Sequence, residues 1–512
     1  TYNSGIYKLY SNGNIENITA KHGENNLNSN RIYKLYMDKN SDIWLASQLG
    51  VSKYTANSNH FTNFTHNPYD RESIIGYQVI DLFEDNSGVL WVGMEGGVSY
   101  FSTQDKGFEH LRYTQDSKKG LLDKSIFSLY IDSKNRLWAS GRNGITIIDR
   151  KTDSYQYYKQ SVESQSKIGR VRMTSVIEVA PNKYWLGTYD HGIAELNTSS
   201  NAIKYIKHDR HDNNSPLTNR IREFFKDSHG FIWIGTQAGL SKYDPITKNF
   251  QHFVHEKDNA HSLAHNRIYD VFEDVNQNIW VGTRGGGLHR YNREKNKFKR
   301  FLHDPNNMNS LSHNRVYAID NDLLGNLWIS TKGGLNKLDL ASGNFTHYRE
   351  SHGLPNDTAN AVIVDKANNV WVSTNQGLAK LDQNTQKFTT YNQDDGLQSN
   401  EFNTHTFFKA KDGELLFGGV DGITAFYPEL LKKHKSLAIP AFIDISIFNQ
   451  SIFASDSSIV NLKSKNANNI SEITLNHQQD MFSIEFAALH FINPLNNKFR
   501  YKLHGFDRDW RE

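Results

Sequence analysis

The sequence contains no cysteine, which excludes disulfide bonds and thiolate metal ligands and is compatible with an extracytoplasmic bacterial protein. No apolar run approaches the roughly 18 residues that a membrane-spanning helix requires. An excess of one charge is also lacking, because 58 Lys and Arg stand against 55 Asp and Glu. A net charge of +3 gives no reason to expect nucleic acid binding. The chain starts at Thr1 without a signal peptide and stops at Glu512, so we expect it to be part of a longer protein.

One sequence block recurs along the chain with a tryptophan at its centre. An example reads Asp-Ser-His-Gly-Phe-Ile-Trp-Ile-Gly-Thr-Gln-Ala-Gly-Leu-Ser-Lys-Tyr over residues 227–243, and copies follow every 43–48 residues. A ninth, degenerate copy has Phe417 in place of the tryptophan. The central residues of the other copies are Trp44, Trp91, Trp138, Trp185, Trp233, Trp280, Trp328 and Trp371. Each block carries four short runs rich in β-branched and aromatic residues, which predicts the four-stranded blade of a β-propeller. A helical repeat would need a 3.6-residue period, and a β-helix a shorter repeat.

Three further features recur within the blocks. The residue two positions after each tryptophan is Ala, Gly or Ser, which would let the next sheet approach closely. A glycine begins the expected third strand, where a hairpin favours a positive φ. Asp-x-x-Gly segments such as Asp227–Gly230 predict tight turns in which the Asp accepts hydrogen bonds from backbone amides, rather than calcium or catalytic sites.

The order of the blocks predicts an all-β chain of three parts. The last block has only three expected strands, and Phe108–Tyr113 has the character of the missing fourth. We therefore predict a complete seven-bladed propeller over residues 107–430, preceded in residues 1–106 by the C-terminal blades of a first propeller. A single ring of nine or ten blades is the alternative. Beyond the basic linker 432–435, the expected strands predict an incomplete, immunoglobulin-like β-sandwich over residues 436–512; they are Phe442–Phe448, Glu472–Leu475, Phe482–Ala487 and Lys498–Leu503.

The tryptophan blocks resemble the repeats of the two-component regulator propeller family. The segments Phe482–Leu489, Asn493-Pro494 and Phe499–Trp510 resemble the truncated triple-tyrosine (Y_Y_Y) domain that follows such propellers. The resemblance implies the periplasmic sensor region of a membrane-bound two-component protein, which dimerises in full length. A transmembrane helix and a histidine kinase, hybrid kinase or diguanylate cyclase would lie outside this chain. It also implies an oligosaccharide ligand, and departures such as Phe417 affect local geometry only.

Propeller loops that join the second and third strands of each blade gather on one face and vary between blocks. Arg, Tyr, His and Asn in these loops suit a polyhydroxylated or anionic ligand. The predicted ligand-binding residues are Arg142, Tyr189, Asp190, His191, Gln237, Arg284, Lys332 and Asn375. The recurring Asn-Arg pairs 219–220, 266–267 and 314–315 favour a structural role.

The sequence predicts no catalytic residue, metal or cofactor. It shows no nucleophile elbow, no ligand spacing among its 22 His and no assignable acid–base carboxylate pair. A non-enzymatic sensor is therefore the preferred hypothesis. We expect no nucleic acid partner, and a membrane association only through the transmembrane helix that would lie outside this chain. The alternatives are a propeller lyase or glycosidase, which acid–base groups converging on one pocket would favour, and a protein-interaction propeller.

Overall fold

The computed structural model describes residues 3–21, 26–55, 58–68, 73–103, 107–114, 119–159, 172–431, 440–453, 467–470, 472–491, 497 and 499–511. The predicted basic linker 432–435 and the Asn493-Pro494 pair lie outside these residues. The chain divides into two compact units, one formed by Lys106–Lys432 and the other by Thr1–Asp105 together with Lys433–Glu512. Throughout the described ranges the structure is strand and turn, with four short 3-10 turns at Glu350–His352, Gln393–Asp395, Pro428–Leu430 and Ala467–Asn469. These ranges contain no helix of the length and apolarity that crossing a membrane demands.

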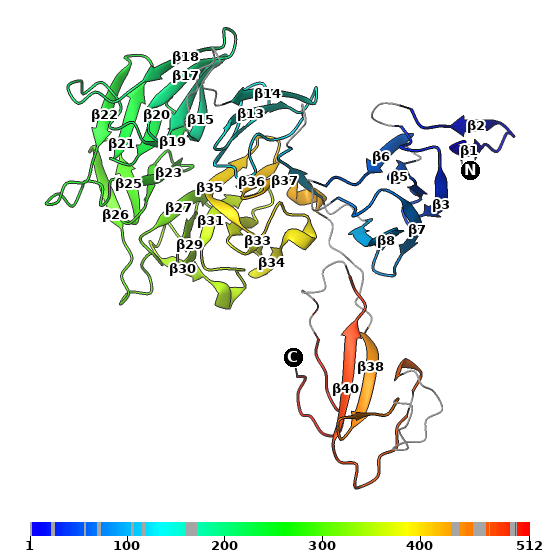
Figure 1. The fold of residues 1–512 in the computed structure, drawn as a ribbon. Coiled ribbons are helices and arrows are strands. Elements are labelled where there is room, and N and C mark those ends of the chain that lie inside the picture. The colour runs from blue at the N-terminus through cyan, green and yellow to red at the C-terminus, as the bar shows by residue number, and fades with distance from the viewer. Residues whose placement is uncertain are drawn as a thin grey trace. The chain divides into compact units, whose positions relative to one another are not determined.

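The unit Lys106–Lys432 contains seven four-stranded antiparallel sheets, arranged around a common centre (Figure 1). The strands of its first four sheets in chain order are β11 (Ser128–Ile131), β12 (Arg136–Ser140), β13 (Gly144–Asp149), β14 (Ser154–Lys159); β15 (Met173–Ala180), β16 (Lys183–Thr188), β17 (Ile193–Asn197), β18 (Ala202–Ile206); β19 (Ile221–Lys226), β20 (Ile232–Thr236), β21 (Leu240–Asp244), β22 (Asn249–Phe253); β23 (Ile268–Glu273), β24 (Ile279–Thr283), β25 (Leu288–Asn292) and β26 (Lys297–Phe301). The remaining strands are β27 (Val316–Asn321), β28 (Leu327–Thr331), β29 (Gly334–Leu338), β30 (Phe345–Tyr348); β31 (Ala359–Val364), β32 (Val370–Thr374), β33 (Gly377–Asp382), β34 (Lys387–Tyr391); β35 (Phe402–Lys409), β36 (Leu415–Gly419), β37 (Gly422–Phe426) and β10 (Phe108–Leu111).

The seven sheets close into a propeller. The innermost strands β11, β15, β19, β23, β27, β31 and β35 contact one another in that order, and β35 also contacts β11. The seventh blade is completed from the start of the unit, because β10 pairs antiparallel with β37 and places Phe108 opposite Phe426. The strand expected in Phe108–Tyr113 therefore closes the ring, and a single ring of nine or ten blades is excluded.

An aspartate–tryptophan bond fixes the turn between the first two strands of most blades. In the blade of β31–β34, Asp365 Oδ1 accepts the backbone N–H groups of Ala367 and Asn369, and its Oδ2 accepts the indole N–H of Trp371 at 2.9 Å. The same indole bond occurs at Trp44, Trp91, Trp138, Trp233, Trp280 and Trp328. Trp185 lacks the turn aspartate and donates to Glu195 instead. The structural interpretation of the Asp turns is thus confirmed.

The small residue two positions after each tryptophan and the glycine of the third strand have the expected packing roles. A Cβ on Gly282 would lie 2.7 Å from the Val316 side chain of the next innermost strand, so a small residue is needed there. The glycine before or at the start of the third strand has a positive φ in all nine blocks; at Gly287, where φ is 71°, a Cβ would lie 2.3 Å from the Phe301 carbonyl oxygen.

The other unit also consists of short antiparallel sheets. Its N-terminal part contains the hairpin β1–β2, which is the expected back half of a blade, a four-stranded sheet β3–β6 and a three-stranded sheet β7–β9. The strands are β1 (Ile6–Leu9), β2 (Ile15–Ile18), β3 (Ile32–Met37), β4 (Ile43–Ser47), β5 (Gly50–Thr55), β6 (His60–Phe64), β7 (Val79–Glu84), β8 (Val89–Met94) and β9 (Gly97–Ser102). The assignment of these sheets to a separate first propeller stays a prediction.

Two of the four expected C-terminal strands are absent. The described sheet there has the order β39-β38-β40, from Gln450–Ser451, Pro440–Ile447 and Phe482–Ala488. Glu472–Leu475 pairs with no other strand among the described residues, and its apolar residues Ile473 and Leu475 pack on the Ile445–Ile447–Ile452 cluster. In Phe499–Leu503, Tyr501 forms only an isolated bridge with Arg511, and Lys498 lies outside the described residues. A complete sandwich therefore stays a prediction.

Candidate functional site

A β-bulge near the start of the innermost strands directs one side chain of each affected blade out of the regular ladder. The register skips Thr174, Arg222, Tyr269, Tyr317 and Asn360 in five successive blades, and Asn403–Thr406 in β35. The residue just before each bulge is buried between the blades, as for Met173, Ile221, Ile268, Val316, Ala359 and Phe402. A bulge re-aims a side chain while the neighbouring residue keeps its packing position. Each blade can thus present a different residue at one end of the central channel.

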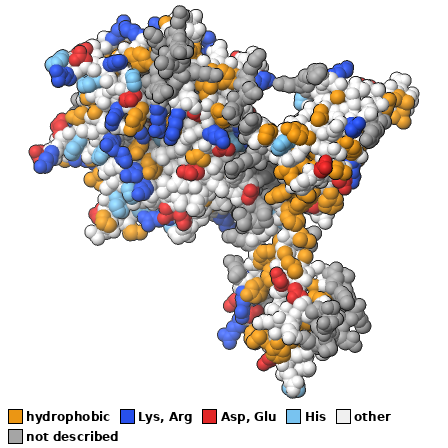
Figure 2. All heavy atoms as spheres, viewed as in Figure 1, with side chains coloured by type: hydrophobic (Ala, Val, Ile, Leu, Met, Phe, Trp, Pro, Cys, Tyr) orange, Lys and Arg blue, Asp and Glu red, His pale blue; other side chains and the backbone are white. Residues whose placement is uncertain are grey.

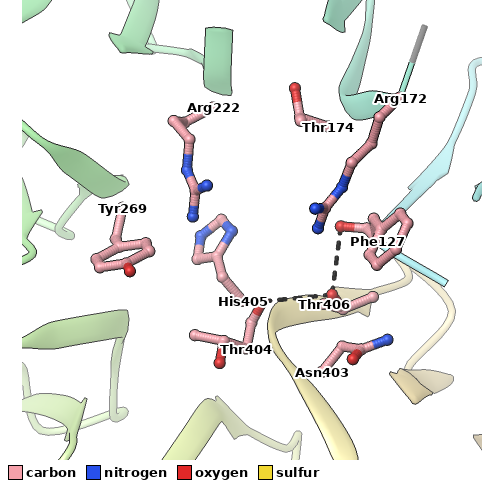
Figure 3. A pocket seen from close by; sticks show the side chains of 9 residues that line it. All are labelled: Phe127, Arg172, Thr174, Arg222, Tyr269, Asn403, Thr404, His405 and Thr406. Atoms are coloured by element: carbon pink, nitrogen blue, oxygen red, sulfur yellow. Dashed lines mark hydrogen bonds between the residues drawn. The ribbon is translucent and has the colours of Figure 1, made fainter. Parts of the chain in front are cut away.

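Several of these bulge residues line a cavity of about 260 Å³ (Figure 3). Its walls come from β15, β19, β23 and β35 and from the residues just before β11 and β15. The lining residues are Phe127, Arg172, Thr174, Arg222, Tyr269, Asn403, Thr404, His405 and Thr406. Asn403 and Thr406 hold the ring together, because they donate to the Ile126 and Phe127 carbonyl oxygens.

Two guanidinium groups point into this cavity from adjacent blades (Figure 3). The Arg172 guanidinium carbon lies 3.8 Å from the Phe127 ring centroid, and that of Arg222 lies 4.9 Å from the Tyr269 ring. Burial lowers the pKa of both arginines. The positive charges of Arg222 and Arg142 lower the pKa of Arg172 further, and that of Arg284 lowers the pKa of Arg222 further. Arginine stays protonated at neutral pH despite such shifts, so the two guanidinium groups make the cavity wall cationic.

Behind the arginines, His405 joins two acidic side chains in the channel. Its Nε2 lies 3.0 Å from Asp270 Oδ1 and its Nδ1 lies 3.6 Å from Glu223 Oε2. His405 has a φ of 56° in the wide bulge of β35, which turns its ring away from the sheet. A second cavity of about 460 Å³ begins on the other side of this cluster, and Glu223, Asp270, Asp320, His405 and Lys409 line it together with apolar residues of the innermost strands.

Burial and mutual charge shift the protonation of this cluster. Burial raises the pKa of Glu223 to about 7, although His405 opposes the shift. Burial alone would lower the pKa of His405, but Asp270 and Glu223 outweigh it and raise the pKa above its ordinary value. Burial also raises the pKa of Asp320. A proton is therefore held among the imidazole and carboxyl groups close to neutral pH.

The same acidic residues also join neighbouring blades. Asp270 Oδ2 accepts the backbone N–H of Ile319 at 2.7 Å, and Asp320 Oδ2 accepts that of Val364 at 2.7 Å. Ser175, at the corresponding place in β15, accepts the N–H of Phe224 and lies 3.4 Å from Glu223. These groups therefore stabilise the inner wall of the ring as well as lining the channel.

The predicted loop residues lie at different distances from this cavity. The ring of Tyr189 lies 5.8 Å from the Arg172 guanidinium carbon, Gln237 and Arg284 line a pocket of about 20 Å³ next to Arg222, and Asn375 accepts a hydrogen bond from the bulge residue Asn360. The charge of Arg142 acts on Arg172.

The other predicted loop residues do not line the described cavities. Asp190 and His191 are exposed and pair with each other at 2.6 Å. The backbone of Lys332 bonds to the Arg315 carbonyl oxygen. The part of these residues in ligand binding stays a prediction.

The asparagine of each Asn-Arg pair has the structural role expected for the pair. Asn219, Asn266 and Asn314 accept the backbone N–H groups of His208, His255 and His303. The bulge residues were not predicted, although a signal for them exists. They stand two positions after the arginine of each pair, as Arg222, Tyr269 and Tyr317.

One described group of side chains has the spacing of a metal site, formed by Asp227, His229 and Glu273. Its carboxylates already bind Arg293, at 3.0 Å and 2.8 Å, and Asp227 also accepts the Trp233 indole. This donor set therefore fits a salt bridge that stabilises the turn better than it fits a cation.

Comparisons with known proteins agree with the repeat pattern. Residues 262–285 match the sequence model of the two component regulator propeller family. A stretch of 112 residues, 22% of the chain, is 28% identical to histidine kinase P4 of Formosa agariphila, and it spans only 8% of that protein. The fold is similar to that of the extracellular domain of the putative hybrid two component system BT3049 from B. thetaiotaomicron, with 22% identity, a TM-score of 0.72 and coverage of 99% of this chain and 70% of that one. The corresponding domain of BT4673 from the same organism gives a TM-score of 0.52 at 20% identity, with coverage of 99% and 66%. The chain is therefore an all-β protein in which residues 262–285 match the two component regulator propeller family.

Proposed function

We propose that this chain is the extracytoplasmic, non-enzymatic sensor region of a membrane-bound two-component signalling protein. Its ligand, an oligosaccharide or a similar polar molecule, binds at the bulge end of the propeller channel. One observation carries the proposal: the cavity there is lined by a different bulge residue from each contributing blade, on a scaffold that otherwise repeats. A repeated scaffold with one varied position per blade suits recognition of an asymmetric ligand.

Signalling requires that the ligand favour one arrangement of the protein over another. The bulge residues stand next to the residues that pack between blades, so a ligand that bridges two bulges also fixes two neighbouring blades. The C-terminal β-sheet and the dimer of the full-length protein would transmit the change to a histidine kinase, hybrid kinase or cyclase.

A propeller lyase or glycosidase is the second candidate, and a specific observation favours it. Glu223, Asp270 and His405 are acid–base groups that line the channel, which the sequence did not predict. The sensor is preferred because Asp270 and His405 bind each other and Asp270 also joins two blades, so these groups serve the ring itself.

A thermal-shift screen of the purified chain against oligosaccharides distinguishes the two candidates. Ligand binding to the native state raises the melting temperature by mass action, by an amount that grows with concentration above Kd. A sensor gives a shift with one class of sugar and an unchanged ligand after long incubation, as measured by chromatography. Product formation that disappears in Glu223→Gln would establish the enzyme instead, and the absence of any shift across the panel would count against a carbohydrate sensor.

A further inference from the structure

The two arginines at the channel mouth have no acidic partner within ion-pair distance among the described residues. Their guanidinium groups instead face aromatic rings, which are Phe127 and Tyr189 for Arg172 and Tyr269 for Arg222. Arg222 is partly buried, where a guanidinium group is costly unless it binds an anion, whereas Arg172 is exposed. Their N–H groups are thus available to a ligand in the cavity.

The nearby acidic side chains do not neutralise this pair. Asp270 and Glu223 both lie within ion-pair distance of His405. The other Asp270 oxygen accepts the backbone N–H of Ile319. Ser175 lies against Glu223. The carboxylates are therefore committed to the channel interior, whereas the arginines remain at its mouth.

More positive charge surrounds the mouth. Arg267 and Arg284 line the small pocket next to Arg222, and the charges of Arg142 and Arg284 act on Arg172 and Arg222 respectively. Lys and Arg side chains also gather on the viewed face of the propeller in Figure 2. The field at the cavity is therefore one that concentrates anions.

We infer that the ligand of this propeller is acidic and that Arg172 and Arg222 together bind its carboxylate or sulfate group in the 260 Å³ cavity. The planar guanidinium fork matches both oxyanions, and rings behind the two arginines hold their planes in place. The class of ligand is an acidic sugar, either a uronate or a sulfate ester. This assignment rests on the proposed sensor function and narrows it.

The test compares matched charged and neutral ligands by isothermal titration calorimetry on the whole 512-residue chain. One arm uses a uronate oligosaccharide and its methyl ester, and the other uses a sulfated oligosaccharide and its desulfated form. We expect one acidic ligand to bind and its neutral counterpart to bind at least about 10-fold more weakly, since a charged hydrogen-bond pair is lost. Which acidic ligand binds distinguishes carboxylate from sulfate.

Variants then assign the contact. Arg172→Gln and Arg222→Gln should each weaken binding of the acidic ligand about 10- to 100-fold and leave the weak binding of the neutral form unchanged. Lys204→Gln, which removes an exposed charge on the outermost strand β18, should bind like the parent chain. The melting temperature of each variant without ligand verifies its fold. It should not fall for the arginine variants, because each removes one of two positive charges that repel each other.

The outcomes separate the two proposals. A neutral oligosaccharide that binds as tightly as its acidic form, with affinity unaffected by either arginine variant, overturns the acidic assignment and leaves the sensor function in place. Failure of both acidic ligands to bind overturns the acidic assignment, and the thermal-shift panel then tests the sensor function itself. If Lys204→Gln weakens binding as much as Arg222→Gln does, the net charge of the protein explains the effect, and a specific arginine site is rejected.

Discussion

At the residue scale, the same side chains serve the ring and the channel. Asp270 accepts a backbone N–H from the next blade and also faces His405, so it cannot change without affecting both the packing of the blades and the protonation of the channel. Glu223 faces His405 from the other side, with Ser175 as its neighbour. The other charged groups that line the two cavities are Arg172, Arg222, Glu178, Lys226, Asp320 and Lys409.

This arrangement predicts that stability falls as the pH rises through neutrality. The folded-state pKa of Glu223 is raised from 4.5 to about 7, so its contribution is fully present below pH 4.5 and is lost by about pH 7. The raised pKa of His405 acts in the same direction, since its contribution is present below pH 6.5 and lost above it. Glu223→Gln should therefore melt at least roughly 2 °C higher than the parent chain at pH 8 and show a flatter profile between pH 5 and 8.

Differential scanning calorimetry across that pH range provides the measurement. The exposed Glu294→Gln removes an equal charge outside the channel and should follow the parent profile. A Glu223→Gln profile that runs parallel to the parent would contradict the assignment of the pH dependence to this group.

At the element scale, the blade and its bulge account for what the sequence did and did not predict. Strand positions and positive-φ glycines follow from local rules that repeat nine times, and the Asp turn follows from a rule that repeats seven times. The structure places these features as expected. The cavity residues depend on a register shift in the innermost strand and on side chains brought together from five blades, which no local pattern specifies. Glu472–Leu475 is predicted as a strand from its apolar residues alone, and Ile473 and Leu475 instead pack on the Ile445–Ile447–Ile452 cluster from an irregular segment.

A glycine substitution tests the hairpin geometry at this scale. Gly287→Ala places a Cβ 2.3 Å from the Phe301 carbonyl oxygen at a φ of 71°, so it should lower the free energy of unfolding of the propeller by about 2 kcal/mol or more. Gly343→Ala is the control, because its φ of 76° is similar but nothing lies within 4 Å of the added Cβ, and it should cost about 1 kcal/mol. Urea denaturation monitored by tryptophan fluorescence measures both, and equal losses would show that the close approach is relieved.

At the scale of the whole molecule, the propeller depends on a strand from the beginning of its own unit. β10 covers the edge of β37 and brings Phe108 into contact with Phe426 and Tyr391, at ring-centroid distances of 5.0 Å and 5.3 Å. An uncovered β37 would leave both an apolar face and unpaired backbone groups open to other chains.

Truncation tests this closure. A chain of residues 107–431 should unfold in one cooperative transition, whereas residues 113–431, which lack β10, should melt roughly 5 °C lower or more and associate through the open edge. Calorimetry and light scattering measure the two effects. Equal melting temperatures and equal monodispersity would show that β10 is dispensable.

The bulges have a consequence for how this protein can change over evolutionary time. Because each blade keeps its packing residue and its recognition residue in adjacent but separate positions, Arg222 or Tyr269 can be replaced without repacking Ile221 or Ile268. Duplication or exchange of single blades would shuffle the recognition residues around the channel while the ring stayed intact. The propeller can thus acquire new ligand specificities one blade at a time.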